Sequence, residues 1–258
     1  MTFSYDDGSV GDDNQFIEIL DANNLEGTFN IYTNYTNLDT RYSQKHEIGN
    51  HIYDHPNLGN TTTYPTIAEV MVPIDEGKAQ IEKNSSHEVR GLVWPGSAPS
   101  SRADYNEILS VLEDRGYIYA RNSGSSYSFS IPTDWMKWNC TTHHNYAASY
   151  WASFKALEQT EALQLFSIWG HSHEFKDDDA DTDATTSWTE ITNLCREIGA
   201  ATDIYSATNK DIVAYANAAK EFTFTETTIT NHSDLNLYVI VNGEQKLLPS
   251  GTTMTIEN

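Results

Sequence analysis

The chain has 258 residues, of which 37 are Asp or Glu and 15 are Lys or Arg, giving a formal net charge of −22 at pH 7. This acidic balance argues against nucleic acid and anionic lipid as partners, because like charges repel, and it disfavours phosphorylated substrates. The length suits one large domain, or one domain with a small appendage. No stretch of about twenty apolar residues predicts membrane insertion.

Apolar runs alternate with helical periodicity over most of the chain. Predicted strands cover 2–5, 28–33, 46–51, 89–94, 117–121, 163–170 and 203–206, and predicted helices cover 14–24, 77–84, 103–116, 146–158, 187–199 and 210–222. Strands separated by helices predict right-handed βα units around a parallel sheet. About seven such units predict an α/β barrel with its active site at the carboxyl ends of the strands.

Beyond about residue 222 the pattern changes to alternation without helical periodicity. Asn242-Gly243 lies between two alternating runs and predicts a tight hairpin turn. We therefore divide the chain into a barrel, 1–221, and a small β appendage, 222–258.

The two cysteines, Cys140 and Cys195, are far apart and form no C-x-x-C motif, so they support no redox or zinc site. The acidic run at 175–183 is interpreted as a solvated surface segment. We expect a monomer that is secreted or on the cell surface, its leader absent from this chain, with a cytoplasmic location left open.

Three short segments contain residues suited to chemistry. Asp6 and Asp7 end the first predicted strand, His51 and His55 lie near a strand end, and His171 follows a late apolar strand. Two histidines and one carboxylate can hold a metal ion while leaving positions free for water and substrate. Taken alone, the pair of histidines is better explained as part of a surface loop.

The segments YDDG and EIGNHIYDHPNL, followed by the late strand-end histidine, together resemble the polysaccharide deacetylases of carbohydrate esterase family 4, over roughly residues 2–220. The resemblance implies a distorted (β/α)7 barrel that removes acetyl groups from sugar polymers with a divalent metal, usually Zn²⁺, with Co²⁺, Ni²⁺ or Mn²⁺ as alternatives. It implies Asp6 as the catalytic base, Asp7, His51 and His55 as metal ligands, and His171 as the acid that protonates the departing sugar group.

The third motif of that family usually reads Arg-Pro-Pro-aromatic-Gly, whereas this chain keeps Trp94, Pro95 and Gly96 without the arginine. An arginine that orients Asp6 must then come from elsewhere. Arg121, ending the predicted strand 117–121, is the first candidate and Arg90 the second, although a surface role accounts equally well for either.

The fourth motif of the family supplies an aspartate that orients the acid histidine and a tryptophan that walls the acetyl pocket. Asp134 and Trp135 are the candidates, although the family's aspartate falls where this chain has Ile131. The residues expected at the substrate site are Tyr5, Trp94, Pro95, Asp134 and Trp135.

Four further residues are expected to lie outside the site. Trp138 is expected in the core, as is usual for a large aromatic side chain. His173 would face the opposite side of a strand from His171. His143 and His144 are interpreted as surface histidines in a loop.

The leading hypothesis is a metal-dependent polysaccharide deacetylase whose partner is an acetylated polysaccharide or oligosaccharide. Its substrate is either the N-acetyl groups of chitin-type or peptidoglycan glycans or the O-acetyl groups of xylan. The alternative is a catalytically silent carbohydrate-binding protein on the same barrel, which the missing arginine supports. A metallophosphatase or nuclease is disfavoured by the acidic charge.

Overall fold

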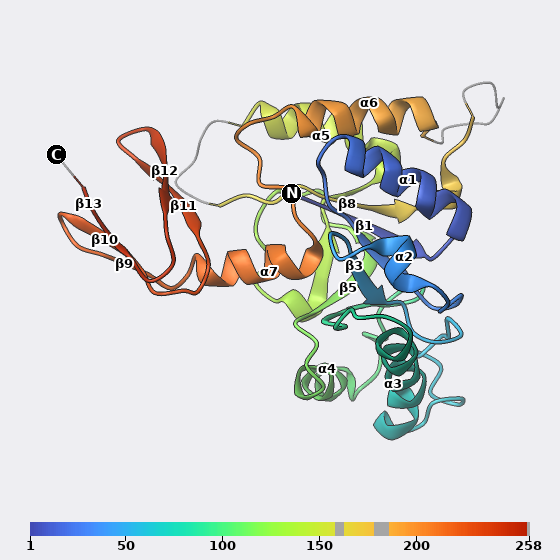
Figure 1. Ribbon diagram of the computed structural model, residues 1–258. Helices are drawn as coiled ribbons and strands as arrows, with labels where there is room; N and C mark the ends of the chain where they lie inside the picture. Colours follow the sequence, from blue (N-terminus) through green and yellow to red (C-terminus); the bar gives the residue numbers. More distant parts are fainter. Residues whose placement is uncertain (158–162, 178–185, 257–258) are drawn as a thin grey trace.

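The computed structural model describes residues 1–157, 163–177 and 186–256 (Figure 1). Eight parallel strands form a nearly closed barrel in the order β6-β5-β4-β3-β2-β1-β8-β7. The strands are β1 (Thr2–Asp7), β2 (Thr28–Ile31), β3 (Glu47–Asn50), β4 (Gly91–Val93), β5 (Tyr119–Ser125), β6 (Trp138–Cys140), β7 (Thr142–His143) and β8 (Ser167–His171). The predicted α/β barrel is confirmed.

Helices surround this sheet (Figure 1). They are α1 (Val10–Ala22), α2 (Leu38–Tyr42), α3 (Ile67–Asn84), α4 (Tyr105–Asp114), α5 (Ala147–Lys155), α6 (Trp188–Gly199) and α7 (Asn209–Ala218), with 3-10 turns η1 (Trp135–Lys137), η2 (His144–Tyr146) and η3 (Ser172–Glu174). Capping boxes at Thr66 and Ser187 satisfy the first backbone N–H groups of α3 and α6. Helix α6 then buries Ile191, Leu194 and Ile198 toward the core.

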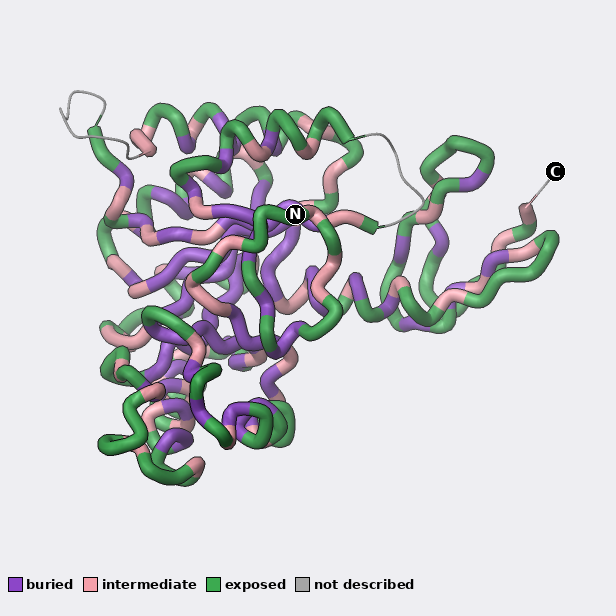
Figure 2. The backbone as a smooth tube through the Cα atoms, turned by 180° about the vertical axis from the view of Figure 1, so that it is seen from behind, coloured by how far each residue is buried: buried purple, intermediate pink, exposed green. Residues whose placement is uncertain are grey.

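The barrel strands are the most buried part of the chain (Figure 2). Strand β1 is buried at its first five positions, as expected for a parallel strand covered on both faces. Within the ranges that the structure describes, no helix combines the length and the apolar character needed to cross a bilayer. The cysteines Cys140 and Cys195 are both buried and free.

The register of the sheet brings the strand ends together. Asp6 pairs with His171 across β1 and β8, and Asp7 pairs with Ile31 across β1 and β2. The N–H of His51, directly after β3, donates to the carbonyl of Ile31 at 3.0 Å. All these groups therefore lie at the carboxyl edge of the barrel, where its active site is expected.

Several predicted boundaries were wrong. Residues 203–206 form no strand, and the N–H of neighbouring Ala207 instead donates to the carbonyl of Met1 at 3.1 Å. Helix α2 and strands β6 and β7 were not predicted, because they are short and polar. The acidic run at 175–183 extends into residues outside those the structure describes.

Two small antiparallel sheets follow α7 and extend to one side of the barrel (Figure 1). Their strands are β9 (Phe222–Phe224), β10 (Thr228–Asn231), β11 (Leu237–Val241), β12 (Glu244–Leu248) and β13 (Thr253–Thr255). Asn242 and Gly243 join β11 to β12 with φ of 53° and 78°, the pair of positive values that a tight hairpin turn requires. The predicted hairpin is confirmed.

Candidate metal and acid-base site

The three expected metal-binding side chains meet at the carboxyl edge of the barrel. His51 Nε2 lies 3.3 Å from Asp7 Oδ1, and His55 Nε2 lies 3.7 Å from the same oxygen. Asp7 ends β1 with φ of 77°, and His55 follows β3 in a loop with φ of 48°. These turns direct side chains from two separate strand ends toward one point.

The spacing and the chemistry of these three groups fit a divalent cation. Metal–ligand bonds of about 2.0–2.1 Å in a tetrahedral arrangement place neighbouring ligand atoms about 3.3–3.4 Å apart, close to the distances observed. Asp7 Oδ1 is buried and has no aligned hydrogen bond. His51 Nδ1 donates to the carbonyl of Val93 at 3.0 Å, so Nε2 is the ring nitrogen that faces Asp7 and is placed to ligate.

The electrostatics of the cluster agree with this fit. Burial alone would raise the pKa of Asp7, but the neighbouring His51, His171 and His55 outweigh it and hold that pKa below its ordinary value. Burial, together with nearby His51, lowers the pKa of His55 and favours its neutral form. An ionised carboxylate and neutral imidazoles are the forms that bind metal.

The other acid of the pair, Asp6, faces a different environment. Its Oδ1 forms a buried ion pair with Arg121 Nη2 and accepts a hydrogen bond of 2.9 Å from Asn30 Nδ2. Arg121 is itself fully buried, and its Nε donates to Ser4 Oγ at 3.0 Å. Burial works against the charge of Arg121, yet Asp6 outweighs it and raises the arginine pKa.

The position of Arg121 explains the departure in the third motif. Arg121 on β5 pairs in register with Val93, the last residue of β4 and the residue just before Trp94. An arginine on β5 therefore reaches the same edge of the barrel as one placed directly after β4. Arg90, the second candidate, instead contacts Glu88 at the surface.

His171 ends β8 between two carboxylates. Its Nε2 lies 3.8 Å from Asp7 Oδ2, and its Nδ1 lies 3.2 Å from Glu174 Oε2. Burial lowers the pKa of His171, but contact with Glu174 and the charges of Asp6 and Asp7 outweigh burial and raise that pKa above its ordinary value. A histidine that holds its proton toward neutral pH is suited to general-acid chemistry.

The side chains of His143 and His144 meet the same carboxylate. His143 Nε2 lies 3.1 Å from Glu174 Oε2, and His144 Nε2 lies 3.5 Å from it. The interpretation as surface histidines is wrong for His144, which is 2% exposed. Burial and the neighbouring histidines lower its pKa to about 3, so this ring is neutral.

The aromatic residues expected at the substrate site are largely in the interior. Tyr5 packs against Phe16 and Phe175, and Trp94 packs near Tyr105. The residues of the expected set that are buried are Tyr5, Trp94, Pro95 and Trp135.

Asp134 lies elsewhere than expected. Its Oδ1 accepts from the N–H of Met136 at 2.9 Å and caps η1, and its Oδ2 lies 3.6 Å from Lys137 Nζ. Trp138, expected in the core, is 1% exposed and packs edge-on against Trp135. Asp134 thus serves the turn before β6, and Glu174 takes the position beside His171.

Three residues at the site were missed by sequence reasoning. Asn30 and Glu174 contact the two acid-base groups directly. Trp169, half-buried on β8, donates from Nε1 to Ser125 Oγ at 3.0 Å and packs edge-on against His143. Their sequence signal was limited to position: Asn30 and Trp169 lie on predicted barrel strands, and Glu174 lies four residues beyond the predicted strand 163–170.

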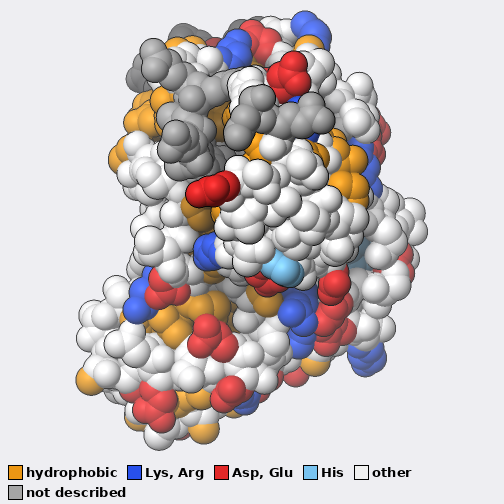
Figure 3. Space-filling view, turned by 90° about the vertical axis from the view of Figure 1, so that its left-hand side faces the viewer, with side chains coloured by type: hydrophobic (Ala, Val, Ile, Leu, Met, Phe, Trp, Pro, Cys, Tyr) orange, Lys and Arg blue, Asp and Glu red, His pale blue; other side chains and the backbone are white. Residues whose placement is uncertain are grey.

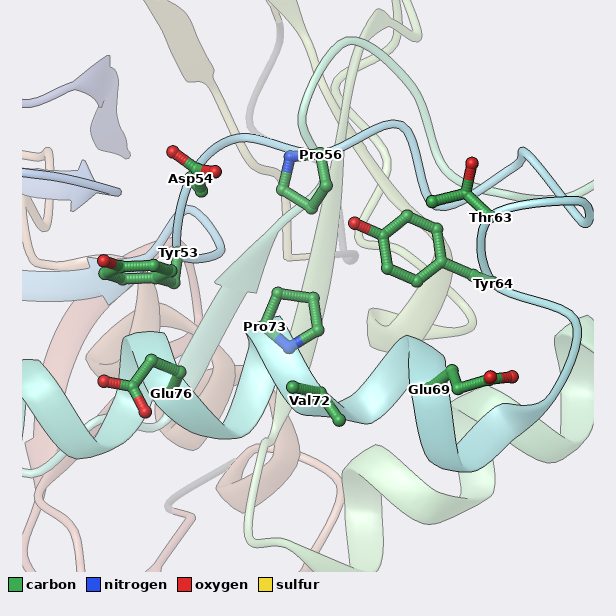
Figure 4. A pocket seen from close by; sticks show the side chains of 9 residues that line it. All are labelled: Tyr53, Asp54, Pro56, Thr63, Tyr64, Glu69, Val72, Pro73 and Glu76. Atoms are coloured by element: carbon green, nitrogen blue, oxygen red, sulfur yellow. The ribbon is translucent and has the colours of Figure 1, made fainter.

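An open pocket of about 400 Å³ adjoins the loop that contains His55 (Figure 4). Asp54 and Pro56, on either side of His55 in the chain, help to line it. Tyr53 is 42% exposed and stacks on Tyr35 with ring centroids 6.3 Å apart. Exposed tyrosine faces of this kind suit the apolar faces of sugar rings.

Comparisons with known proteins agree with this architecture. Residues 1–119 match the family model described as polysaccharide deacetylase. A search of curated proteins finds no match.

Among solved structures, the chain is similar to a candidate polysaccharide deacetylase from Mycobacterium smegmatis, with 13% identity, a TM-score of 0.56 and coverage of 85% of this chain and 90% of that one. It is similar to a variant of the peptidoglycan deacetylase PdaC from Bacillus subtilis, with 14% identity, a TM-score of 0.50 and coverage of 85% and 92%. A CE4 esterase from Streptococcus mutans shares 12% identity, with a TM-score of 0.51 and coverage of 81% and 85%. At these identities the structural matches show a shared fold.

Proposed function

We propose that the chain belongs to the polysaccharide deacetylase family, whose model its residues 1–119 match. On that basis we propose that it is a divalent-metal hydrolase that removes acetyl groups from a polysaccharide. The observation that carries the proposal is the convergence of two groups at one edge of the barrel. Asp7, His51 and His55 form a metal-binding set, and Asp6 and His171 lie beside it as an acid-base pair.

Different residues of this chain would have different roles in the reaction. Asp7, His51 and His55 would hold the ion, most simply Zn²⁺ given the nitrogen and oxygen ligands, with Co²⁺, Ni²⁺ or Mn²⁺ as alternatives. When bound, a divalent ion supplies positive charge that polarises the acetyl carbonyl and makes water easier to deprotonate. Asp6 accepts the proton of the attacking water, and His171 gives a proton to the departing sugar group.

Arg121 supports Asp6 in this role. A buried arginine beside the carboxylate holds its orientation and leaves it placed to act as a base. The missing third-motif arginine had favoured a catalytically silent binding protein. An arginine on β5 that reaches Asp6 removes that argument, so an active enzyme is the better proposal.

The substrate is an acetylated polymer with its sugar rings near the tyrosines of the His55 loop. We propose two substrate classes, N-acetyl groups of chitin-type or peptidoglycan glycans and O-acetyl groups of xylan. Substrates of both classes lie outside the cell membrane, so we also propose a secreted or cell-surface enzyme that acts as a monomer.

The proposal is tested by acetate release from chitooligosaccharides, peptidoglycan and acetylated xylan. Metal-stripped protein is measured before and after addition of zinc or cobalt. Metal-dependent acetate from any one polymer supports the proposal and identifies the substrate. A His51→Ala variant should lose both bound metal and activity. Bound metal without acetate from any of the three polymers would favour the silent binding protein.

A further inference from the structure

The cluster around Glu174 is not explained by the metal set or by the base. It consists of Glu174, His171 and His143, from η3, β8 and β7, and each contributes one ligand-type atom within 4.8 Å of the others. The buried ring of His144 lies against the same carboxylate oxygen. Three imidazole rings around one carboxylate oxygen require a role.

We propose that Glu174, itself held by His143, is the positioning residue for His171. It fixes the imidazole so that Nδ1 faces the carboxylate and Nε2 faces the substrate side, toward Asp7. The inference rests on the proposed deacetylase function. It assigns to the turn after β8 a task that the sequence had suggested for Asp134.

The local backbone explains why Glu174 reaches His171. The two residues are three apart, and the intervening 3-10 turn η3 brings side chains at this spacing to the same side. Glu174 Oε2 lies 3.2 Å from His171 Nδ1, whereas His171 Nε2 lies 3.8 Å from Asp7 Oδ2. The two ring nitrogens therefore have different partners, which is what an acid with one fixed donor requires.

The hydrogen bonding of His143 favours a carboxylate–histidine pair over a second cation site. The N–H of Asn145 donates to His143 Nδ1 at 3.4 Å, so Nδ1 is an acceptor and the ring proton lies on Nε2. Nε2 is the atom that faces Glu174 at 3.1 Å. A cation bound there would need Nε2 without its proton.

Glu174 Oε2 and His171 Nδ1 are both buried and have no aligned hydrogen bond. Catalytic hydrogen bonds are often long or misaligned before substrate binds and tighten in the complex. Glu174 Oε2 and His171 Nδ1 are close but imperfectly aligned. This fits a hydrogen bond whose partners are already in place and which tightens when substrate binds. The burial of both atoms makes the pair specific, because neither has bulk water as an alternative partner.

The proton balance of the step is simple. Water adds its oxygen to the acetyl carbon and passes one proton to Asp6, and the carbon–nitrogen or carbon–oxygen bond to the sugar breaks. The departing sugar atom takes a proton from His171 Nε2, giving acetic acid, which ionises to acetate in solution, and a free amine or hydroxyl. The proton gained by Asp6 then passes to solvent, and His171 takes one up from solvent, which restores both groups. Glu174 stays ionised throughout and holds the Nδ1–H group, so it takes up no proton.

This arrangement predicts a dependence on the leaving group. A sugar amine or alkoxide leaves slowly unless it is protonated, whereas para-nitrophenolate leaves readily without a proton. Misalignment of His171 should therefore slow release from a polysaccharide and have little effect on para-nitrophenyl acetate. A purely structural role for Glu174 would slow both substrates together.

The test uses zinc-loaded Glu174→Gln, Glu174→Asp and, as a matched control, Asp177→Asn, which changes an exposed carboxylate three residues along the chain. On the polymer identified by acetate release, we expect Glu174→Gln to lower kcat about 10- to 100-fold with KM within about twofold. Hydrolysis of para-nitrophenyl acetate should change by less than about threefold. Glu174→Asp should recover part of the loss, and Asp177→Asn should match wild type.

Imidazole nitrogen NMR gives a readout that does not depend on activity. His171 Nδ1 should be protonated in the zinc-loaded wild type, and its signal should shift in Glu174→Gln. Equal losses on both substrates, or an unchanged His171 signal, would overturn the positioning role. Two zinc ions per chain in wild type and one in Glu174→Gln would identify a second cation site instead. Absence of acetate from every polymer with the predicted NMR shift present would count against the proposed function alone.

Discussion

At the residue scale, two adjacent carboxylates occupy different environments at the end of β1. Asp6 is 1% exposed, and its Oδ1 forms an ion pair with Arg121 and accepts a hydrogen bond from Asn30. Asp7 adopts a positive φ that turns its side chain toward His51 and His55. The two adjacent carboxylates therefore have separate partners: Arg121 and Asn30 for Asp6, and the two histidines for Asp7.

Asp6→Asn should separate the two roles. An asparagine keeps the shape of the side chain but cannot accept the proton of water, so acetate release should fall by at least about 10²-fold. Zinc content, measured by elemental analysis, should stay at the wild-type value because Asp6 is outside the metal set. Asp7→Asn is the matched control and should lose zinc. Substantial activity in the Asp6 variant would mean that another group is the base.

Arg121→Ala should affect both turnover and stability. Removing the arginine leaves Asp6 buried without its partner, which costs about 3–5 kcal/mol in the free energy of unfolding. We expect kcat to fall more than KM rises, because the arginine holds the base rather than the sugar. Urea unfolding and steady-state kinetics measure the two effects.

The control for Arg121→Ala is Arg115→Ala. Its ion pair with Asp75 is on the surface, where loss of such a pair costs about 0–1 kcal/mol. Equal destabilisation by the two substitutions would contradict the special role of the buried pair. A stable but inactive Arg121 variant would still support an orienting role.

The resemblance of the YDDG and EIGNHIYDHPNL segments to the polysaccharide deacetylases predicted Asp7, His51 and His55 as one set, and the structure brings the three side chains together. Parallel strands share one carboxyl edge, so Asp7 after β1 and His51 after β3 come close, and the loop after β3 then brings in His55. The Glu174 cluster was not predictable in this way. It depends on the short strand β7 and the 3-10 turns η2 and η3, which bring His143, His144 and Glu174 together through tertiary contacts.

At the element scale, β8 approaches its neighbours closely because of one glycine. Gly170 pairs with Tyr5 of β1, and a Cβ at Gly170 would lie 2.0 Å from His144 Nδ1. The absence of a side chain lets the His144 ring lie against the strand. This close approach places the η2 turn, and with it His143, beside the end of β8.

Gly170→Ala should therefore disturb the site without changing any site residue. The added methyl group must displace His144, so we expect destabilisation of about 1–3 kcal/mol and a lower kcat. Gly11→Ala is the control, since a Cβ at Gly11 in α1 meets nothing within 4 Å. That substitution should leave stability within about 0.5 kcal/mol of wild type and kcat unchanged, because Gly11 is in the exposed first turn of α1. Wild-type kinetics in Gly170→Ala would show that the packing of His144 does not support the site.

The elements that could be predicted were those with a strong apolar period. Strand β1 and helix α6 have such a pattern, and both lie close to their predicted places. Strands β6 and β7 are short and include polar residues. Pairing with the neighbouring barrel strands stabilises them. Pairing of that kind comes from tertiary structure and leaves no local signal.

At the scale of the whole molecule, the barrel and the appendage have separate cores. Ile229, Val241 and Leu248 form the buried centre of the appendage, and the apolar side chains packed against them also lie in 222–256. Tyr238, on the outer face of β11, is half exposed, and Figure 3 shows hydrophobic side chains at the surface among charged ones on this side of the molecule. The site, by contrast, is built from residues 4–174.

A chain shortened to residues 1–221 should fold and keep its activity. The hydrogen bond from the Tyr238 N–H to Tyr215 Oη, 2.9 Å, links the appendage to α7, and Tyr215 is itself only partly buried. We expect the melting temperature to change by less than about 4 °C, which corresponds to roughly 1–2 kcal/mol for a chain of this size. Zinc content and acetate release from the same polymer should match the full chain.

Aggregation, or a broad non-cooperative transition, would show that the barrel depends on the appendage and that the division at residue 221 is wrong. Weaker release from insoluble polymer with unchanged release from short oligosaccharides would instead assign the appendage a role in holding the polymer.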